Sequence, residues 1–356
     1  MPRDELERYG MQVPYKDEDK TKSAFVSLKL ALKAYFSTDI VHHHDLDGIN
    51  VDTEHDEYLT TLLRYQEIYL QTIFHFHHFF ELLIKDTLRK VHPLLPVKLS
   101  KLDDKNSKKI IEVMNNTRAI FRDETVEFST ALSRLVSLTR TDYNQPLCEL
   151  FKNDYNHRTL TFLNQCRNRA WHKGTWVLRY TELDKFIGQR VLPLVLEAIN
   201  NSLYKGFERS WMYEKPIASI DPIQNIIDLT KKDQIDYNQI ALNKAIGRAC
   251  YNIPKKGRML FKSYKRSKGV LKAKALIEES GDIYDIRECF VCGYESLILF
   301  KEEDWDYDDN GEMIDGWWKI LMAECETCKL KIFDRFGEPS VYDSNIPKLW
   351  LGGDLK

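Results

Sequence analysis

Hydrophobic positions recur with a helical period through about the first 215 residues of the chain. Residues 21–36 place their apolar side chains as an amphipathic helix does, and a second pattern predicts a long helix over 57–92 that ends before Pro93. The middle of this long helix, IFHFHHFFELLIK, is apolar on nearly all sides. Such a segment is typical of a helix at the centre of a bundle.

Further helical patterns follow, separated by polar segments. Residues 107–140 predict one or two helices, and residues 155–173 predict another that Gly174 closes as a C-cap. A last helix is expected over 180–204, with a kink near Pro193 because proline has no backbone N–H to donate. Residues 39–56 are polar and predict a loop.

The helical period disappears from residue 281 onward. Two β-type runs, ESLILF and WWKILM, flank an acidic segment in which Asn310-Gly311 indicates a hairpin turn. The expected fold is therefore mainly α, with a helical domain and a small C-terminal β domain. The expected boundaries are a helical domain over 1–215, a basic connector with short helices over 216–280, and the β domain over 281–356.

Length and composition limit the class of protein. A chain of 356 residues is long enough for two or three domains, and 43% hydrophobic with 30% charged residues indicates a soluble globular protein. No apolar run approaches the roughly 18 residues of a membrane span, and the N-terminus lacks the apolar segment of a secretory signal. We therefore expect a cytoplasmic protein without a membrane partner.

The charge is unevenly distributed. The whole chain has a formal charge of −2, yet residues 281–356 hold 18 acidic and 8 basic residues, a net charge of −10. The first 280 residues consequently carry +8. A basic body favours a polyanionic partner, which the acidic region either repels or screens.

Four of the seven cysteines form two CxxC pairs, Cys289-x2-Cys292 and Cys325-x2-Cys328. Each pair is a tight turn that directs two thiolates at one ion, and two pairs complete the tetrahedral site of a zinc ribbon. We expect one structural zinc per chain and a reducing compartment. Gly293 fits the first turn, whereas Lys329 is less usual after the second. Unbound buried thiols and a redox pair are the alternatives.

The segment CRNRAWHKG holds a second candidate site, formed by Arg167, Asn168 and His172 near a helix end. Arginine offers fixed donors for phosphate, and histidine transfers protons near neutral pH. These groups suit RNA transesterification without a catalytic metal, in which a 2′-hydroxyl attacks its own phosphate.

The spacing alone is not specific. Arg167 and His172 lie about 140° apart on a helix, so one chain presents an incomplete site. Asn168 and His172 do share a face. The alternative is an ordinary solvated helix end, where His172 interacts with the C-terminal end of the helix dipole.

The residues RNRAWH resemble the RNxxxH signature of HEPN domains, all-helical bundles of which many members are metal-independent ribonucleases that act as dimers. Residues 74–88, FHFHHFFELLIKDTL, are similar to the long early helix of such domains, where a Glu and a Lys four residues later recur, here Glu81 and Lys85. The resemblance covers roughly residues 57–205. Trp171, immediately before the histidine, is a departure that either stacks on a base or simply packs.

The resemblance implies a homodimer with both motifs lining one cleft, Arg167 and His172 as catalytic groups, and Asn168 as a positioning group. The expected function is a metal-independent endoribonuclease in a bacterial toxin or anti-phage context, with an inhibitor or activator protein as a possible partner. The alternative is an inactive HEPN scaffold that binds nucleic acid or a partner protein.

Other charged segments have weaker interpretations. Residues 255–274 hold nine basic residues and no acidic one, interleaved with Phe261 and Tyr264, which predicts RNA contact or else a solvated helix or linker. The acidic segment 302–315 is a solvated hairpin tip or an RNA mimic. The predicted RNA-binding residues are Lys255, Lys256, Arg258, Lys262, Lys265 and Arg266.

Two histidine groups, His42–His44 with Asp45 and His75 with His78, are alternative metal sites, although solvated or hydrogen-bonded histidines explain them more simply.

Overall fold

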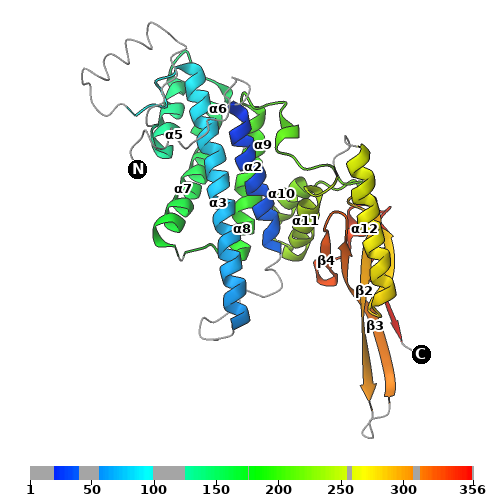
Figure 1. Ribbon diagram of the computed structural model, residues 1–356. Helices are drawn as coiled ribbons and strands as arrows, with labels where there is room; N and C mark the ends of the chain where they lie inside the picture. Colours follow the sequence, from blue (N-terminus) through cyan, green and yellow to red (C-terminus); the bar gives the residue numbers. More distant parts are fainter. Residues whose placement is uncertain are drawn as a thin grey trace, which may run out of the picture. The chain divides into compact units, whose positions relative to one another are not determined.

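The computed structural model describes residues 20–39, 56–98, 125–174, 176–254, 259–307 and 313–354, without the side chains of 20–22, 56–59, 259–267, 307 and 313–314. This part of the chain is mainly helical with a small antiparallel sheet toward its C-terminal end, which confirms the predicted fold class (Figure 1). None of its helices combines the length and apolarity needed to cross a membrane. The chain divides into two compact units that alternate along the sequence. The first unit comprises 1–32, 70–177 and 194–212, and the second comprises 33–69, 178–193 and 213–356.

The first unit is a bundle of helices. It includes the later part of α3, whose apolar middle is buried through Phe76, Phe79, Phe80 and Leu83, as its all-round hydrophobicity predicts. The rings of Phe79 and Phe80 lie 5.1 Å apart between centroids. The helices that contribute to this unit are α2 (Lys20–Phe36), α3 (Asp56–Val91), α5 (Phe128–Ser137), α6 (Pro146–Lys152), α7 (Asp154–Lys173) and α9 (Leu192–Asn200).

The helix expected over 180–204 consists of three segments. An α-helix, α8 (Tyr180–Phe186), continues into a π-helical turn, Ile187–Val191, and then into α9. Pro193 cannot donate the hydrogen bond that an α-helix requires of it, and the wider turn lies directly before it. Gly188 within this turn lies so close to Thr230 that a Cβ atom would collide with the threonine side chain.

The second unit contains two capped helices, α10 (Pro222–Thr230) and α11 (Tyr237–Cys250). Aspartate side chains accept backbone N–H groups at both starts, and α11 is buried along nearly its whole length. Its Lys244 is fully buried and forms an ion pair with Asp184 of α8. The ammonium group also donates to Thr38 Oγ1 over 2.7 Å and lies 4.3 Å from the centre of the Tyr180 ring.

The sheet of the second unit is antiparallel in the order β1-β2-β3-β4, and β5 also pairs with β3. Its long hairpin runs from Leu297 opposite Cys325 to Tyr307 opposite Met313. The hairpin agrees with the sequence pattern, although the Asn310-Gly311 turn lies outside the described residues. The strands are β1 (Ile283–Glu288), β2 (Glu295–Tyr307), β3 (Met313–Cys325), β4 (Lys331–Phe333) and β5 (Gly352–Asp354).

A further helix, α12 (Met259–Glu279), packs against β1 and β2. Ala273 of this helix is buried with Ile283 and Ile298 of the sheet. Gly269 allows a close approach to Thr327, because a Cβ atom at this position would collide with the threonine hydroxyl. Residues 259–274 of the basic segment therefore belong to a helix of 21 residues, whose Gly269 and Ala273 contact the β domain.

Candidate functional site

Helix α7 carries the RNxxxH residues, and its ends are well defined by sequence. At the start, the Asn153 side chain accepts the backbone N–H groups of Tyr155 and Asn156 over 3.0 and 3.4 Å. At the end, Gly174 adopts a left-handed φ of 64° and its N–H donates to Ala170, which confirms the predicted C-cap. His172 lies in the last turn, where the helix dipole favours positive charge.

Arg167 is half-buried and has two contacts on its own helix. Its Nη1 donates to Asn168 Oδ1 over 2.9 Å, and its guanidinium carbon lies 5.6 Å from the centre of the Trp171 ring. The Trp171 ring also makes an edge-to-face contact with Phe74 of α3, at 5.8 Å and 85°. These contacts hold Arg167, Asn168 and Trp171 together on one side of α7.

His172 is exposed in the same turn. The described contacts join Arg167 to Asn168 but do not join either residue to His172. This separation agrees with the roughly 140° between positions 167 and 172 on a helix. A single chain thus offers a guanidinium and an imidazole at one helix end, in different directions.

A chain of polar side chains connects α3 and α7 beside Arg167. His77 of α3 is buried, and its Nε2 lies 2.9 Å from Asn164 Oδ1 of α7. Glu81 lies 3.8 Å from His77 Nδ1 and also binds the buried Lys85. Burial lowers the pKa of His77, the Asn164 bond and Glu81 oppose that effect, and the positive charge of Arg167 lowers the pKa further. A lowered pKa favours the neutral imidazole, which suits an uncharged link between the helices.

The four cysteines of the CxxC pairs meet in the second unit. All four are buried, and their sulfur atoms lie within 4.8 Å of one another. The Sγ atoms of Cys289 and Cys328 are 3.7 Å apart, and those of Cys292 and Cys325 are 3.6 Å apart. Tetrahedral zinc with Zn–S bonds of about 2.3 Å requires sulfur atoms roughly 3.8 Å apart, so the spacing fits a metal.

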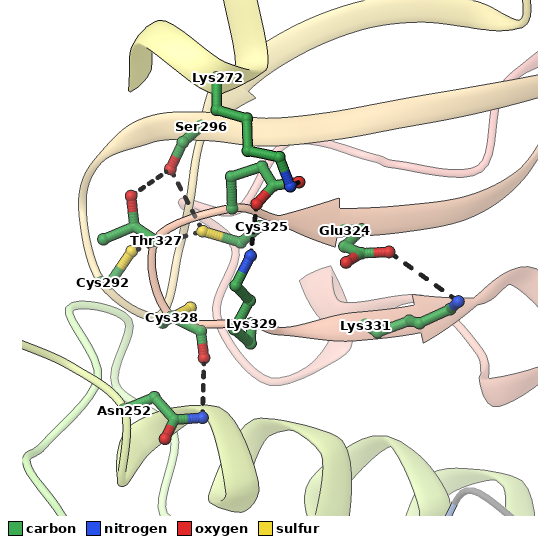
Figure 2. A network of polar contacts seen from close by, with 11 residues as sticks. Asn252, Lys272, Cys292, Ser296, Glu324, Cys325, Thr327, Cys328, Lys329 and Lys331 are labelled. Carbon is green, nitrogen blue, oxygen red and sulfur yellow. Dashed lines mark hydrogen bonds and ion pairs between the residues drawn. The ribbon is translucent and has the colours of Figure 1, made fainter. Parts of the chain in front are cut away.

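Backbone and side-chain contacts support both turns of this cluster, and Figure 2 shows the side-chain contacts around Cys325. The N–H groups of Gly293 and Lys329 donate to the carbonyls of Cys289 and Cys325 over 2.7 and 2.8 Å. Ser296 Oγ lies 3.3 Å from Cys325 Sγ and 2.8 Å from the Thr327 hydroxyl. Side chains around the ligands thereby fix the ligands' orientation, as in established metal sites.

The electrostatics of the cluster also favour a cation. Burial raises the pKa of the Cys289 thiol. Hydrogen bonds from Cys289, Cys292 and Cys328 lower the pKa of Cys325. A divalent metal stabilises the thiolate form of all four cysteines. These four residues can hold a metal, and with four protein ligands no position remains for water.

The other predicted sites are less fully described. Lys255, Lys256 and Arg258 lie outside the described residues, as do His42–His44 and Asp45. Lys262, Lys265 and Arg266 belong to α12, but their side chains lie outside the described part. Within the described part, the four cysteines are the one group of three or more side chains placed to share a metal. Of the alternative histidine site, His78 bonds to Ser27 over 2.8 Å, and burial lowers the pKa of His75.

Sequence reasoning did not find Asn164 or the role of His77. Asn164 lies three residues before Arg167, one turn earlier on the same face, but an asparagine within a helix carries no distinguishing pattern. Ser296 and Thr327 were also missed, because the contacts of Ser296 with Thr327 and with Cys325 join residues that are distant in sequence. No family model matches this sequence, and searches of curated proteins and of solved structures gave no significant match.

Proposed function

We propose that the protein is a metal-independent endoribonuclease that uses Arg167, Asn168 and His172. The observation that carries the proposal is the end of α7, where Arg167 bonds to Asn168 while His172 is exposed in the same turn. Guanidinium and imidazole groups are the two that phosphodiester transesterification needs: one to stabilise charge and one to transfer protons. The similarity to the HEPN signature supports the same assignment.

The proposed reaction needs no group from outside the RNA and the protein. The 2′-hydroxyl loses its proton to an imidazole, and its oxygen forms a bond to the adjacent phosphorus. The bond from phosphorus to the 5′-oxygen breaks, and that oxygen takes a proton as it leaves. Arg167 stabilises the extra charge on the phosphoryl oxygens. Asn168 orients Arg167 through their hydrogen bond.

The directions of Arg167 and His172 on α7 favour a shared site in a homodimer. Because the two positions lie about 140° apart on one helix, a second copy of α7 facing the first supplies the groups that one copy lacks. Each composite site then pairs Arg167 of one copy with His172 of the other. The proposed helical bundle is HEPN-like, and the proposed C-terminal module is a zinc ribbon whose zinc is structural.

The cellular setting is proposed from the resemblance alone. A cytoplasmic ribonuclease of this kind serves as a toxin or in defence against phage, under the control of an inhibitor or activator protein. RNA is the proposed partner, bound in part by the basic residues of the 255–274 segment.

One observation favours the alternative, an inactive scaffold that binds nucleic acid or protein. Arg167 is half-buried, and its guanidinium is already occupied by Asn168 and Trp171. RNA cleavage in the presence of a chelator separates the two functions. We expect cleavage at an unchanged rate under conditions where the protein retains its structural metal by elemental analysis. RNA that stays intact while bound to the protein would favour the scaffold.

A further inference from the structure

Trp171 is an unusually exposed tryptophan in a fixed position. Its side chain is 66% exposed, although Phe74 contacts its ring edge-to-face and the guanidinium of Arg167 lies 5.6 Å from its centre. These neighbours hold the ring while most of its surface stays open. Tryptophan is enriched at binding interfaces because its ring combines a large apolar face with a polar N–H group.

The position of Trp171 links it to the proposed chemistry. Asn168 lies three residues earlier and Arg167 four residues earlier, which places all three on one side of α7. His172 is the next residue. A planar group stacked on Trp171 would therefore lie beside Arg167 and Asn168, with His172 about 100° further around the helix.

The charge around Trp171 matches a nucleic acid. After Asp154, α7 contains no acidic residue. Arg169 and Lys173 are exposed near the same end of the helix, and the Arg169 guanidinium lies 5.1 Å from the centre of the Trp176 ring. The cation beside the Trp171 ring itself is Arg167, and an aromatic surface next to an arginine combines base stacking with phosphate attraction, the two interactions that bind single-stranded nucleic acids.

We propose that Trp171 stacks on an unpaired nucleobase adjacent to the phosphate that is cut, so that the substrate class is single-stranded RNA. The inference rests on the proposed function for its reaction but not for its binding. In an A-form duplex the bases are paired and stacked on one another, and a side chain on an exposed helix cannot reach their faces. Stacking on Trp171 therefore favours unpaired over paired RNA, and it discriminates little between the four bases.

Binding measurements with uncleavable RNA test the stacking independently of catalysis. The probes are fluorescein-labelled oligouridine and oligoadenosine, 2′-O-methylated throughout, each single-stranded or annealed to its complement, and binding is followed by fluorescence anisotropy. Trp171→Ala should weaken binding to the single strands by roughly 5- to 150-fold, the effect of losing one stacked base. Trp171→Phe should retain most of the affinity of the unmodified protein, because phenylalanine keeps an aromatic face.

A matched control is Tyr143→Ala, which removes another exposed aromatic side chain, 62% exposed, from the same unit. It should leave binding unchanged. Equal affinity of Trp171→Ala and the unmodified protein for single strands would overturn the proposal. So would a change from dimer to monomer in Trp171→Ala by light scattering, because Trp171 would then be a contact between copies.

The cleavage assay keeps this inference distinct from the proposed function. If the protein binds single strands through Trp171 but cuts no unmodified RNA, the stacking proposal stands and the nuclease proposal fails. If it cuts RNA and Trp171→Ala cuts single-stranded and paired substrates as the unmodified protein does, the stacking proposal fails alone.

Discussion

Gly293 and Lys329 occupy equivalent positions, each directly after a CxxC pair, and both have a left-handed backbone, with φ of 72° and 60°. Lys329 is the one non-glycine residue with positive φ in the described part of the chain. In both turns this conformation lets the backbone N–H donate to the carbonyl of the first cysteine. The two halves of the cluster therefore use the same turn, although only one of them has the residue that adopts it without strain.

The symmetry of the two turns predicts opposite outcomes for two substitutions. Gly293→Ala should destabilise the second unit, because a left-handed backbone costs a non-glycine residue about 1–2 kcal/mol and the new Cβ would collide with Ile217. Lys329→Gly relieves the same strain and should be neutral or slightly stabilising, since the Glu326 carboxylate that loses Lys329 keeps its ion pair with Lys272. Thermal unfolding of the two variants and of the unmodified protein measures this, and equal melting temperatures for all three would contradict the proposed strain.

The four-cysteine cluster predicts that the protein binds a metal ion. Elemental analysis should give about one zinc per chain, and Cys289→Ser should remove it. The sheet should then unfold while the helical part of the circular dichroism signal remains, because the metal supplies much of the folding energy of such a small module. The control is Cys148→Ala, which removes a buried thiol outside the cluster. A metal-free protein whose C-terminal residues stay protected from protease would contradict the assignment.

The buried ion pair of Lys244 and Asp184 predicts a large stability effect. Both side chains are fully buried, and burial lowers the pKa of Lys244 despite the neighbouring carboxylate. Lys244→Met should cost about 3–5 kcal/mol of unfolding free energy, because it leaves an unpaired buried carboxylate. Combining it with Asp184→Leu should recover much of that loss. Urea unfolding of both single variants and the double variant measures the coupling, and additive losses would show that the pair is not coupled.

The sequence predicted those structural elements that depend on residues close to one another along the chain. The apolar middle of α3, the Gly174 cap and the CxxC turns each rest on a few consecutive side chains, and the structure agrees with each. The π-helical turn before Pro193 also depends on the packing of Gly188 against Thr230, which are distant in sequence. No local pattern shows such a contact.

The candidate site on α7 also has features that the local sequence predicted and contacts that it did not predict. Its sequence predicted the helix, its cap and the different directions of Arg167 and His172, because all three follow from helical geometry. It did not predict that Asn164 binds His77, or that Phe74 supports Trp171, since both contacts join residues of two helices. Those contacts decide how far Arg167 and Trp171 are open to a ligand.

A shared active site predicts complementation between inactive chains. Arg167→Ala and His172→Ala should each be inactive alone. Mixing the two variants should restore part of the activity, because a dimer with one chain of each holds one site in which Arg167 and His172 are both present. Light scattering should show a dimer for the unmodified protein and for both variants. A strictly monomeric protein that cuts RNA, or mixtures that remain inactive although the chains exchange, would exclude a composite site.

The chemistry proposed for His172 determines the ends of the cleaved RNA. If the substrate's own 2′-hydroxyl is the nucleophile, the products carry a 2′,3′-cyclic phosphate or 3′-phosphate and a 5′-hydroxyl. DNA, and RNA with a 2′-O-methyl group at the cut site, should stay intact. His172→Ala should lose activity by about 10²- to 10⁴-fold, as expected for a general acid–base group, and should still bind RNA through its basic residues.

A second histidine of the same helix provides the control for that variant. His157 lies 15 residues earlier on α7, about 22 Å along the helix axis, and its side chain is half-buried. His157→Ala should therefore keep nearly full activity, which would show that the loss in His172→Ala is not a general effect of removing a histidine from α7. End-group analysis of the cleaved RNA is the decisive measurement. A 5′-phosphate product, or cleavage of DNA at a similar rate, would mean that a water molecule attacks the phosphorus, and His172 would then only interact with the C-terminal end of its helix dipole.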